Sequence, residues 1–303
     1  MRFKLLMILL LFNTANLADA EINVVTTASN AAALIKEIGG KQVNVTSLTK
    51  GSQDPHYVEA KPSYMMMVSK ADLLVSIGLD LEIGWLPSLL KGARNSQVVA
   101  GAKGSLVLGD FIEPLEKIEG NISREHGDVH PFGNPHFLLD PMRTAALSHV
   151  VAKKLGELDP TNRDVFNQNA VEFASRLKEL TDIWKKQIKE SGVKEIFTYH
   201  KTLVYFLERM HVHSVGSIEP KPGVPPTPGH ILGLIKVAKK LGIRLTLVEN
   251  YFETTAAERI ARDVEGMQVK SVPVSVEGAE GITYLVDLYK ALVAAVSKSS
   301  KGR

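Results

Sequence analysis

The stretch DVFNQNAVEFASRLKELTDIWKKQIKES, residues 164–191, decides how the rest of the chain can be arranged. Apolar residues recur in it at steps of three and four: Phe166, Ala170, Phe173, Leu177, Leu180 and Trp184. This spacing places them on one face of an α-helix. The stretch contains no Gly or Pro, unlike an ordinary flexible linker. We therefore predict one long rigid helix that connects the segments before and after it, packs on both and limits hinge motion.

On both sides of this helix, runs of β-branched residues alternate with helical patterns, which indicates βα units with mainly parallel sheets. We predict an α/β protein of two lobes, residues 21–160 and 193–303, joined by a connecting helix at 161–192. The predicted strands are 22–27, 43–48, 73–77 and 97–100 in the first lobe, and 194–199, 212–218, 245–249 and 270–274 in the second. The predicted helices are 31–38, 62–71, 81–93, 141–158, 202–210, 228–241, 254–264 and 284–296.

The first twenty residues are laid out like an export signal, and we expect them to be removed. Two basic residues, Arg2 and Lys4, precede an apolar run at 5–12, and Ala18-Asp19-Ala20 has the small residues of a cleavage site. No second apolar stretch of about 20 residues follows that could span a bilayer. We therefore expect a soluble protein in a periplasm-like compartment, without a lipid anchor on a cysteine at the cleavage site.

The composition excludes several kinds of site. The chain of 303 residues contains no Cys, so disulfides, thiolate nucleophiles, Cys-bound zinc and iron–sulfur clusters are impossible. With 36 Lys and Arg against 33 Asp and Glu, and no basic block of five or more, the chain lacks the charge pattern of a nucleic-acid-binding protein. Any metal must therefore be bound by nitrogen and oxygen ligands, and we expect no nucleic-acid partner.

A four-residue phrase occurs twice, as DPHY at 54–57 and as NPHF at 134–137. Proline fixes its own φ and keeps the preceding residue extended, so each phrase presents its histidine on a stiff turn ahead of a predicted helix. A third histidine, His200, and a carboxylate, Glu249, end predicted strands of the second lobe. Ligands of open parallel sheets bind outside the carboxyl ends of the strands, so we expect these four side chains to meet in the cleft between the lobes.

Together, His56, His136, His200 and Glu249 would offer three imidazole nitrogens and one carboxylate oxygen, a set that suits tetrahedral Zn²⁺. A set of hard carboxylates and waters would suit Mn²⁺ or Mg²⁺ better. For any one of these histidines alone, a capping or packing role is the commoner alternative. The repeated phrase, the strand-end position of the third histidine and the export signal together favour a metal site.

These motifs resemble those of the periplasmic metal-binding subunits of zinc and manganese ABC importers, the cluster A-I solute-binding proteins of the ZnuA/TroA type. The resemblance extends from Ile22 to about Ser297, and its marks are DPH at 54–56, NPH at 134–136 with DP at 140–141, YHK at 199–201, EP at 219–220 with the Pro-rich run around it, and VE at 248–249. It implies two αβ lobes bridged by one long helix, little domain closure and a single metal ion in the interlobe cleft. It further implies a monomeric binding protein, not an enzyme, which delivers Zn²⁺, or less readily Mn²⁺, to a membrane permease.

The fourth ligand is where this sequence departs from the family pattern. Many members carry an Asp after the last strand of the second lobe, and Ser275 stands at that position here. We expect Glu249 to replace it, with Glu277 as the second choice and a water molecule as the third. Members that import manganese tend to carry a carboxylate where this chain has His200, which favours zinc.

The segment 119–134 holds His126, Asp128 and His130. It resembles a shortened version of the His- and acid-rich loop that zinc-specific members carry beside the cleft. A functional loop would hold a weak second site that captures zinc or hands it on without setting the main affinity. A solvated turn with incidental histidines is the alternative.

Two other functions compete with transport. An exported zinc hydrolase also uses three histidines with an open fourth position, but the HExxH motif of many such enzymes is absent here. A metal-sequestering or adhesive surface protein on the same fold would carry the same site and differ in its partners. A filled fourth position without an opening for a substrate would favour binding over hydrolysis.

Overall fold

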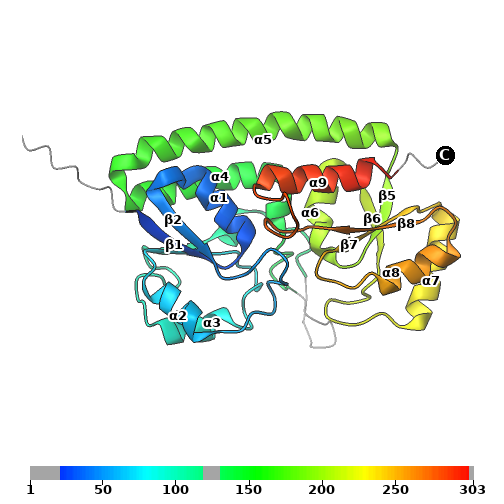
Figure 1. Cartoon of the computed structure of the whole chain (residues 1–303), viewed down its shortest axis with the longest axis horizontal. Coiled ribbons are helices and arrows are strands. Elements are labelled where there is room, and N and C mark those ends of the chain that lie inside the picture. Colours follow the sequence, from blue (N-terminus) through cyan, green and yellow to red (C-terminus); the bar gives the residue numbers. More distant parts are fainter. Residues whose placement is uncertain (1–20, 119–129, 300–303) are drawn as a thin grey trace, which may run out of the picture.

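The computed structural model describes residues 21–118 and 130–299. Two α/β lobes lie side by side beneath one long helix, which confirms the predicted architecture (Figure 1). The predicted export signal, and the loop residues His126 and Asp128, lie outside the described residues. No helix in the described part of the chain combines the length and apolar character that crossing a membrane requires.

The first lobe contains a four-stranded, wholly parallel sheet in the order β2-β1-β3-β4. Its strands are β1 (Ile22–Thr26), β2 (Val43–Ser47), β3 (Leu73–Ser76) and β4 (Ser105–Val107), and its helices are α1 (Ser29–Gly39), α2 (Pro62–Ser69) and α3 (Leu86–Ala93). Every residue of β3 is buried, as expected for a parallel strand covered on both faces.

The second lobe repeats this arrangement with the order β6-β5-β7-β8, again wholly parallel. Its strands are β5 (Glu195–Thr198), β6 (His213–Ser217), β7 (Leu245–Glu249) and β8 (Gln268–Val272), and its helices are α6 (Val204–Met210), α7 (Pro228–Leu241) and α8 (Thr255–Asp263). Because all strands of each sheet are parallel, their carboxyl ends lie along one edge of the sheet. The two edges can therefore face a common cleft.

Three helices form a layer that covers both lobes: α4 (Pro141–Leu158), α5 (Arg163–Ser191) and α9 (Leu285–Ser297). Figure 1 shows α5 running above both sheets, with α9 lying alongside it and ending near the C-terminal end of α5. Helix α5 has 29 residues, which correspond to a length of about 44 Å. One continuous apolar core includes buried residues of both sheets and of all three helices. The lobes are therefore joined through a shared core, although their exact boundaries remain a prediction.

The buried face of α5 is close to the predicted one. It consists of Phe166, Ala170, Phe173, Leu177, Thr181, Trp184 and Ile188. Leu180, predicted on this face, is only half-buried, and its neighbour Thr181 takes the buried position. The Thr181 hydroxyl donates a hydrogen bond to the Leu177 backbone carbonyl, so it costs little to bury.

The strand predicted at 97–100 is wrong, because these residues form turns. The fourth strand of the first sheet is β4, and its residue Leu106 pairs with Val75 of β3. Val98 is nevertheless 1% exposed, so its side chain enters the core from a turn. A buried valine in a turn produces the same local apolar signal as a short strand, which explains the error.

The helix predicted at 81–93 begins only at Leu86. Residues 79–85 form turns, and the buried Glu82 carboxylate accepts hydrogen bonds from the backbone N–H groups of Ile77 and Gly78 and from the Thr27 hydroxyl. These bonds hold the chain in a turn, where Leu79 and Asp80 both have positive φ. The hydrogen bonds of the Glu82 side chain thus keep residues 79–85 in turns, and the helix begins later than predicted.

The start of α4 agrees with its predicted cap. Asp140 accepts a hydrogen bond from the Met142 backbone N–H at 2.8 Å, and Pro141 occupies the first turn. The Asp140 side chain is fully buried and accepts from Arg143 at 2.8 Å and from Arg209 at two positions of 2.9 Å. The buried charge is therefore fully paired. It also connects α4 to α6, the helix that carries Arg209.

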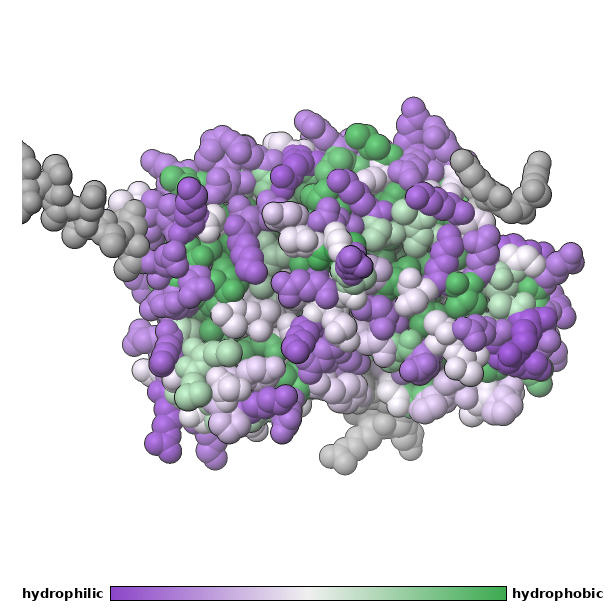
Figure 2. Space-filling model, in the orientation of Figure 1, coloured by the Kyte–Doolittle hydropathy of each residue, from purple (hydrophilic) through white to green (hydrophobic). Residues whose placement is uncertain are grey.

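Away from the core, the face of the molecule shown in Figure 2 is mostly polar, with apolar side chains scattered between the charged ones over both lobes. This mixture is usual for a folded protein surface.

Replacing Asp140 by Ala is expected to lower the free energy of unfolding by about 2–4 kcal/mol, because the helix loses its cap and two partly buried arginines lose their partner. Urea denaturation of the metal-free protein measures this change. Asp182→Ala on the exposed face of α5 serves as the control and should change the value by less than about 0.5 kcal/mol. Equal effects of both substitutions would contradict the assigned role of Asp140.

Candidate metal centre

The structure brings three predicted site residues together. His56 lies in the loop between β2 and α2, His136 immediately precedes the turn that leads into α4, and His200 follows β5. One ring nitrogen from each can be chosen so that all three lie within 4.8 Å of one another. The three imidazoles therefore lie together as expected, and their role as metal ligands stays a prediction.

The position of His136 was predicted for the wrong reason. It was expected at a corner between a strand and a helix, but it is separated from the last strand before it, β4, by 28 residues that include an undescribed segment. Its position comes instead from the short 3-10 helix Phe137–Leu139 that follows it and is buried in the core. The other two histidines do follow strands.

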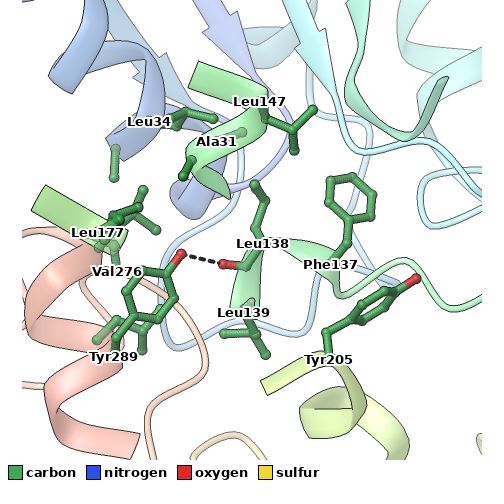
Figure 3. Packing of buried hydrophobic residues seen from close by; sticks show 14 of the residues in the cluster. Ala31, Leu34, Phe137, Leu138, Leu139, Leu147, Leu177, Tyr205, Val276 and Tyr289 are labelled. Atoms are coloured by element: carbon green, nitrogen blue, oxygen red, sulfur yellow. Dashed lines mark hydrogen bonds between the residues drawn. The ribbon is translucent and has the colours of Figure 1, made fainter. Parts of the chain in front are cut away.

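That 3-10 helix anchors the site to the helix layer. Figure 3 shows the Tyr289 hydroxyl of α9 pointing at the Leu138 backbone carbonyl, to which it donates a hydrogen bond of 2.8 Å. Phe137 packs edge-on against Tyr205 of α6, with ring centroids 6.4 Å apart. The residue directly before this helix, His136, is therefore held by contacts with elements of the second half of the chain.

The two copies of the repeated phrase fold alike. Asp54 Oδ1 accepts the backbone N–H of His56 at 3.0 Å, and Asn134 Oδ1 accepts that of His136, also at 3.0 Å. In each case a side chain two residues earlier closes a small turn, as Asp and Asn commonly do. The first residue of the phrase therefore fixes the backbone of the histidine, while the proline stiffens the connection.

Asp54 also orients the ring of His56. Its Oδ1 lies 2.6 Å from Nδ1 of that ring, so the ring donates Nδ1–H and directs Nε2 towards the other histidines. Burial alone would raise the pKa of Asp54, but the hydrogen bonds and charge of His56 outweigh it and the net pKa is lowered. The carboxylate is therefore ionised when it holds the ring.

Asn134 joins the two lobes beside the site. Its side-chain amide donates to the Lys201 backbone carbonyl at 2.8 Å and to Glu116 at 3.1 Å, and its backbone carbonyl accepts from the Tyr205 hydroxyl at 2.6 Å. Lys201 pairs with Glu116 at 2.7 Å. These bonds fix the His136 turn to the segment that follows His200.

Glu219 holds the ring of His200 as Asp54 holds that of His56. Its Oε2 lies 2.5 Å from Nδ1 of His200, and its Oε1 accepts the Gly223 backbone N–H at 2.8 Å. Burial would lower the pKa of His200, but the hydrogen bond to Glu219 and the charges of Glu249, Glu219 and Asp54 raise it overall. Nε2 of His200 is left to face the cleft.

The Nε2 atom of His136 is buried and makes no hydrogen bond with the described residues. Burial, followed by the nearby rings of His56, His200 and His130, holds the pKa of His136 well below its ordinary value. The ring is therefore neutral at physiological pH and has an unshared electron pair in a buried position, as a metal ligand needs.

Glu249 ends β7 as predicted, and its carboxyl group is fully buried close to His200. Neither oxygen makes a well-formed hydrogen bond, and burial raises the pKa of Glu249 to about 7 despite the opposing charge of His200. Among the described residues, the compact group of potential ligands contains the three histidines and does not include Glu249. Glu249 therefore lies next to the ring cluster and not within it.

Ser275, at the position where the family resemblance led us to expect an Asp, lines a cavity of about 40 Å³ together with His136. A second cavity, of about 50 Å³, is lined by Asp54 and His56 from one lobe and by His200 and Glu219 from the other. The rings therefore meet in the cleft between the lobes, where the sequence placed them.

His130 lies closer to the site than the sequence prediction implied. Its Nε2 atom is 3.0 Å from Nε2 of His56, and its Nδ1 atom is 3.1 Å from the Leu79 backbone carbonyl. From the sequence, this residue was expected in a loop beside the cleft, either in a weak second site or in a solvated turn. His130 is not part of a repeated phrase, and nothing in the sequence around it indicates a contact with His56, 74 residues earlier.

Comparison with known proteins places the whole chain. It matches the family model ZnuA, zinc-uptake complex component A, periplasmic, over residues 24–298. It is 26% identical over 257 residues to the zinc-binding protein AdcA of Streptococcus pyogenes serotype M6, covering 81% of this chain but only 48% of AdcA. It is 25% identical over 272 residues to the manganese ABC transporter substrate-binding lipoprotein PsaA of Streptococcus pneumoniae serotype 4, covering 87% and 84% of the two chains.

Solved structures share the fold. The crystal structure of ZnuA superposes with a TM-score of 0.77 at 24% identity, covering 93% of this chain and all of that one. A structure of the laminin-binding adhesin Lmb of Streptococcus agalactiae gives a TM-score of 0.78 at 21% identity, covering 92% of this chain. The family match spans nearly the full described chain, so this protein is a member of the ZnuA family, zinc-uptake complex component A, periplasmic.

Proposed function

We propose that this chain binds a divalent metal ion, above all Zn²⁺, in the periplasm and delivers it to the permease of an ABC-type importer. The observation that carries the proposal is the convergence of His56, His136 and His200 from separate segments, with ring nitrogens within 4.8 Å of one another. The orphaned buried Nε2 of His136 adds to it, because a bound ion would give that atom a partner. Membership of the family supports the transport role.

We propose Glu249 as the carboxylate of the site. Its two buried oxygens without hydrogen-bond partners lie near His200, and its ionised form would stabilise a dication held by neutral rings. The alternative carboxylate, Glu277, lacks a comparable observation among the described residues.

Zinc is favoured over manganese by the donor set. Three imidazole nitrogens suit Zn²⁺, whereas Mn²⁺ prefers oxygen ligands. Relatives named for zinc and for manganese are both similar to this chain, so the comparisons alone leave the metal open. The lack of a carboxylate at the His200 position is the feature of this chain that points to zinc.

Binding is favoured over hydrolysis by the size of the space around the rings. The cavities that contact His136 or His200 measure about 40, 50 and 100 Å³. Pockets for drug-sized ligands measure about 300–1,000 Å³, so these three spaces suit an ion and a few waters, whereas the larger groove beside His56, of about 650 Å³, contacts neither His136 nor His200. We propose a binding protein that works as a monomer, and equilibrium sedimentation of the purified chain tests the oligomeric state.

The direct test is competitive titration of the purified, metal-stripped protein against a chromophoric zinc chelator and, separately, against Mn²⁺. One Zn²⁺ per chain is expected, held more tightly than Mn²⁺. His136→Ala and His200→Ala should each weaken zinc binding by more than about 100-fold, because a direct ligand is lost, and Glu249→Gln should weaken it less. Unchanged stoichiometry and affinity in both histidine variants would refute the site.

Asp54 and Glu219 are expected to act through the rings they hold. Removing such a partner typically costs about 10- to 100-fold in metal affinity, so Asp54→Ala and Glu219→Ala should each fall in that range. Glu59→Ala, in the same loop as Asp54, is the matched control, since its side chain is 80% exposed and pairs only loosely with Lys61 at 3.8 Å. Isothermal titration with zinc measures all three, and a loss in the control as large as in the others would contradict the assignment.

Zinc affinity should fall as the pH is lowered from 8 to 5. Binding requires neutral imidazoles, so protons compete with the metal. Because the pKa of His200 is raised, this competition begins at a pH above the ordinary pKa of histidine. Roughly a tenfold loss per pH unit is expected for each proton displaced. Titrations at several pH values with buffers of different ionisation enthalpy measure both the affinity and the protons released; a flat profile would argue against imidazole ligation.

A further inference from the structure

His130 and His56 are in direct contact through their Nε2 atoms. The two atoms lie 3.0 Å apart, and the ring centroids are separated by 5.1 Å with the planes tilted by 36°. His130 also shares a cavity of about 100 Å³ with His136 and His200. A fourth imidazole therefore stands at the edge of the three-ring cluster.

The other nitrogen of each ring determines which atoms carry hydrogen. Nδ1 of His130 lies 3.1 Å from the Leu79 backbone carbonyl, which can only accept, so this nitrogen bears the hydrogen. Nδ1 of His56 faces the Asp54 carboxylate at 2.6 Å and bears a hydrogen for the same reason. In their neutral forms, both rings then direct the lone pair of Nε2 at the other.

Two lone pairs at this distance repel each other unless a positive charge lies between or beside them. Two nitrogen ligands of a tetrahedral Zn²⁺, each at about 2.0–2.1 Å, are about 3.3–3.4 Å apart. The observed 3.0 Å is within a few tenths of an ångström of that separation. Small rotations of the two rings would therefore allow both to bind the same ion.

We propose that His130 is a fourth imidazole ligand, which binds the same ion as His56, His136 and His200 and takes the coordination position that Ser275 leaves open. This inference rests on the proposed function. It replaces the expectation that the loop residue belongs only to a weak second site. Glu249 then serves the ion as a nearby negative charge. In the structure His130, like Glu249, lies outside the compact group formed by the other three histidines, so its ring must move inward to share their ion.

The place of His130 gives it a distinct part in metal exchange. A groove of about 650 Å³ is lined by His130 and His56 together with Tyr57, Ile83 and Trp85. His136 and His200 contact the smaller inner cavities. His130 therefore lines the groove as His56 does, so an ion that leaves through the groove passes these two rings, and release should depend on His130 as well as on the metal affinity of the other rings.

The test counts imidazoles around zinc by X-ray absorption at the zinc edge, using the full chain loaded with one Zn²⁺. Four imidazoles are expected in the unchanged protein and three in His130→Ala. Affinity should fall by at least about tenfold and dissociation into excess chelator should accelerate by a similar factor. His213→Ala is the control, because that exposed histidine begins β6, at the opposite end of the strands from the rings.

A second variant separates ligation from loop anchoring. His130→Asn can still donate a hydrogen bond to the Leu79 carbonyl but lacks Nε2, so it should resemble His130→Ala if the ring binds zinc. Recovery of affinity and release rate in His130→Asn would assign only an anchoring role and overturn the proposal. So would three imidazoles in the unchanged protein. Failure of the unchanged protein to bind any zinc would instead refute the proposed function.

Discussion

The shared core beneath α5 fixes the distance between the two sheets, and the meeting of the histidine rings depends on that distance. Metal ligands must be placed to within about 0.2 Å, yet here they come from segments as far apart as residues 56 and 200. Buried residues of both sheets, α4, α5 and α9 form one cluster, so moving one lobe against the other would open this core. This shared core supports the expectation of little lobe closure, with an ion captured by local motions of turns and rings.

Local hydrogen bonds complete what the core begins. Each histidine turn is closed by the side chain two residues earlier, and the rings of His56 and His200 are oriented by carboxylates on Nδ1. Asn134 performs two of these tasks at once, since its oxygen fixes the His136 turn and its amide reaches the segment after His200. Asn134 thus connects the backbone turn at His136 to the segment after His200 on the other side of the cleft.

The sequence predicted the fold and the ring cluster well because their signals are local or ordered along the chain. The period of α5, the cap at Asp140 and the repeated Pro-His phrase each lie within a few neighbouring residues. The misplaced fourth strand shows the limit, since Val98 is buried from a turn. The roles of Glu219 and His130 depend on contacts across 19 and 74 residues, and nothing in the local sequence specifies such pairs.

The distribution of charge around the rings bears on which ion fits. Neutral imidazoles give a dication no charge compensation of their own, and two carboxylates beside the rings, Asp54 and Glu219, contact the far nitrogens of the rings. Their charge polarises the rings and makes Nε2 a stronger donor, while their oxygens stay away from the ion. An ion that prefers direct oxygen contact gains little from this arrangement, whereas one that binds nitrogen well gains both the donors and the screened negative charge. The position of the carboxylates behind the rings, and not only the number of histidines, therefore favours zinc over manganese.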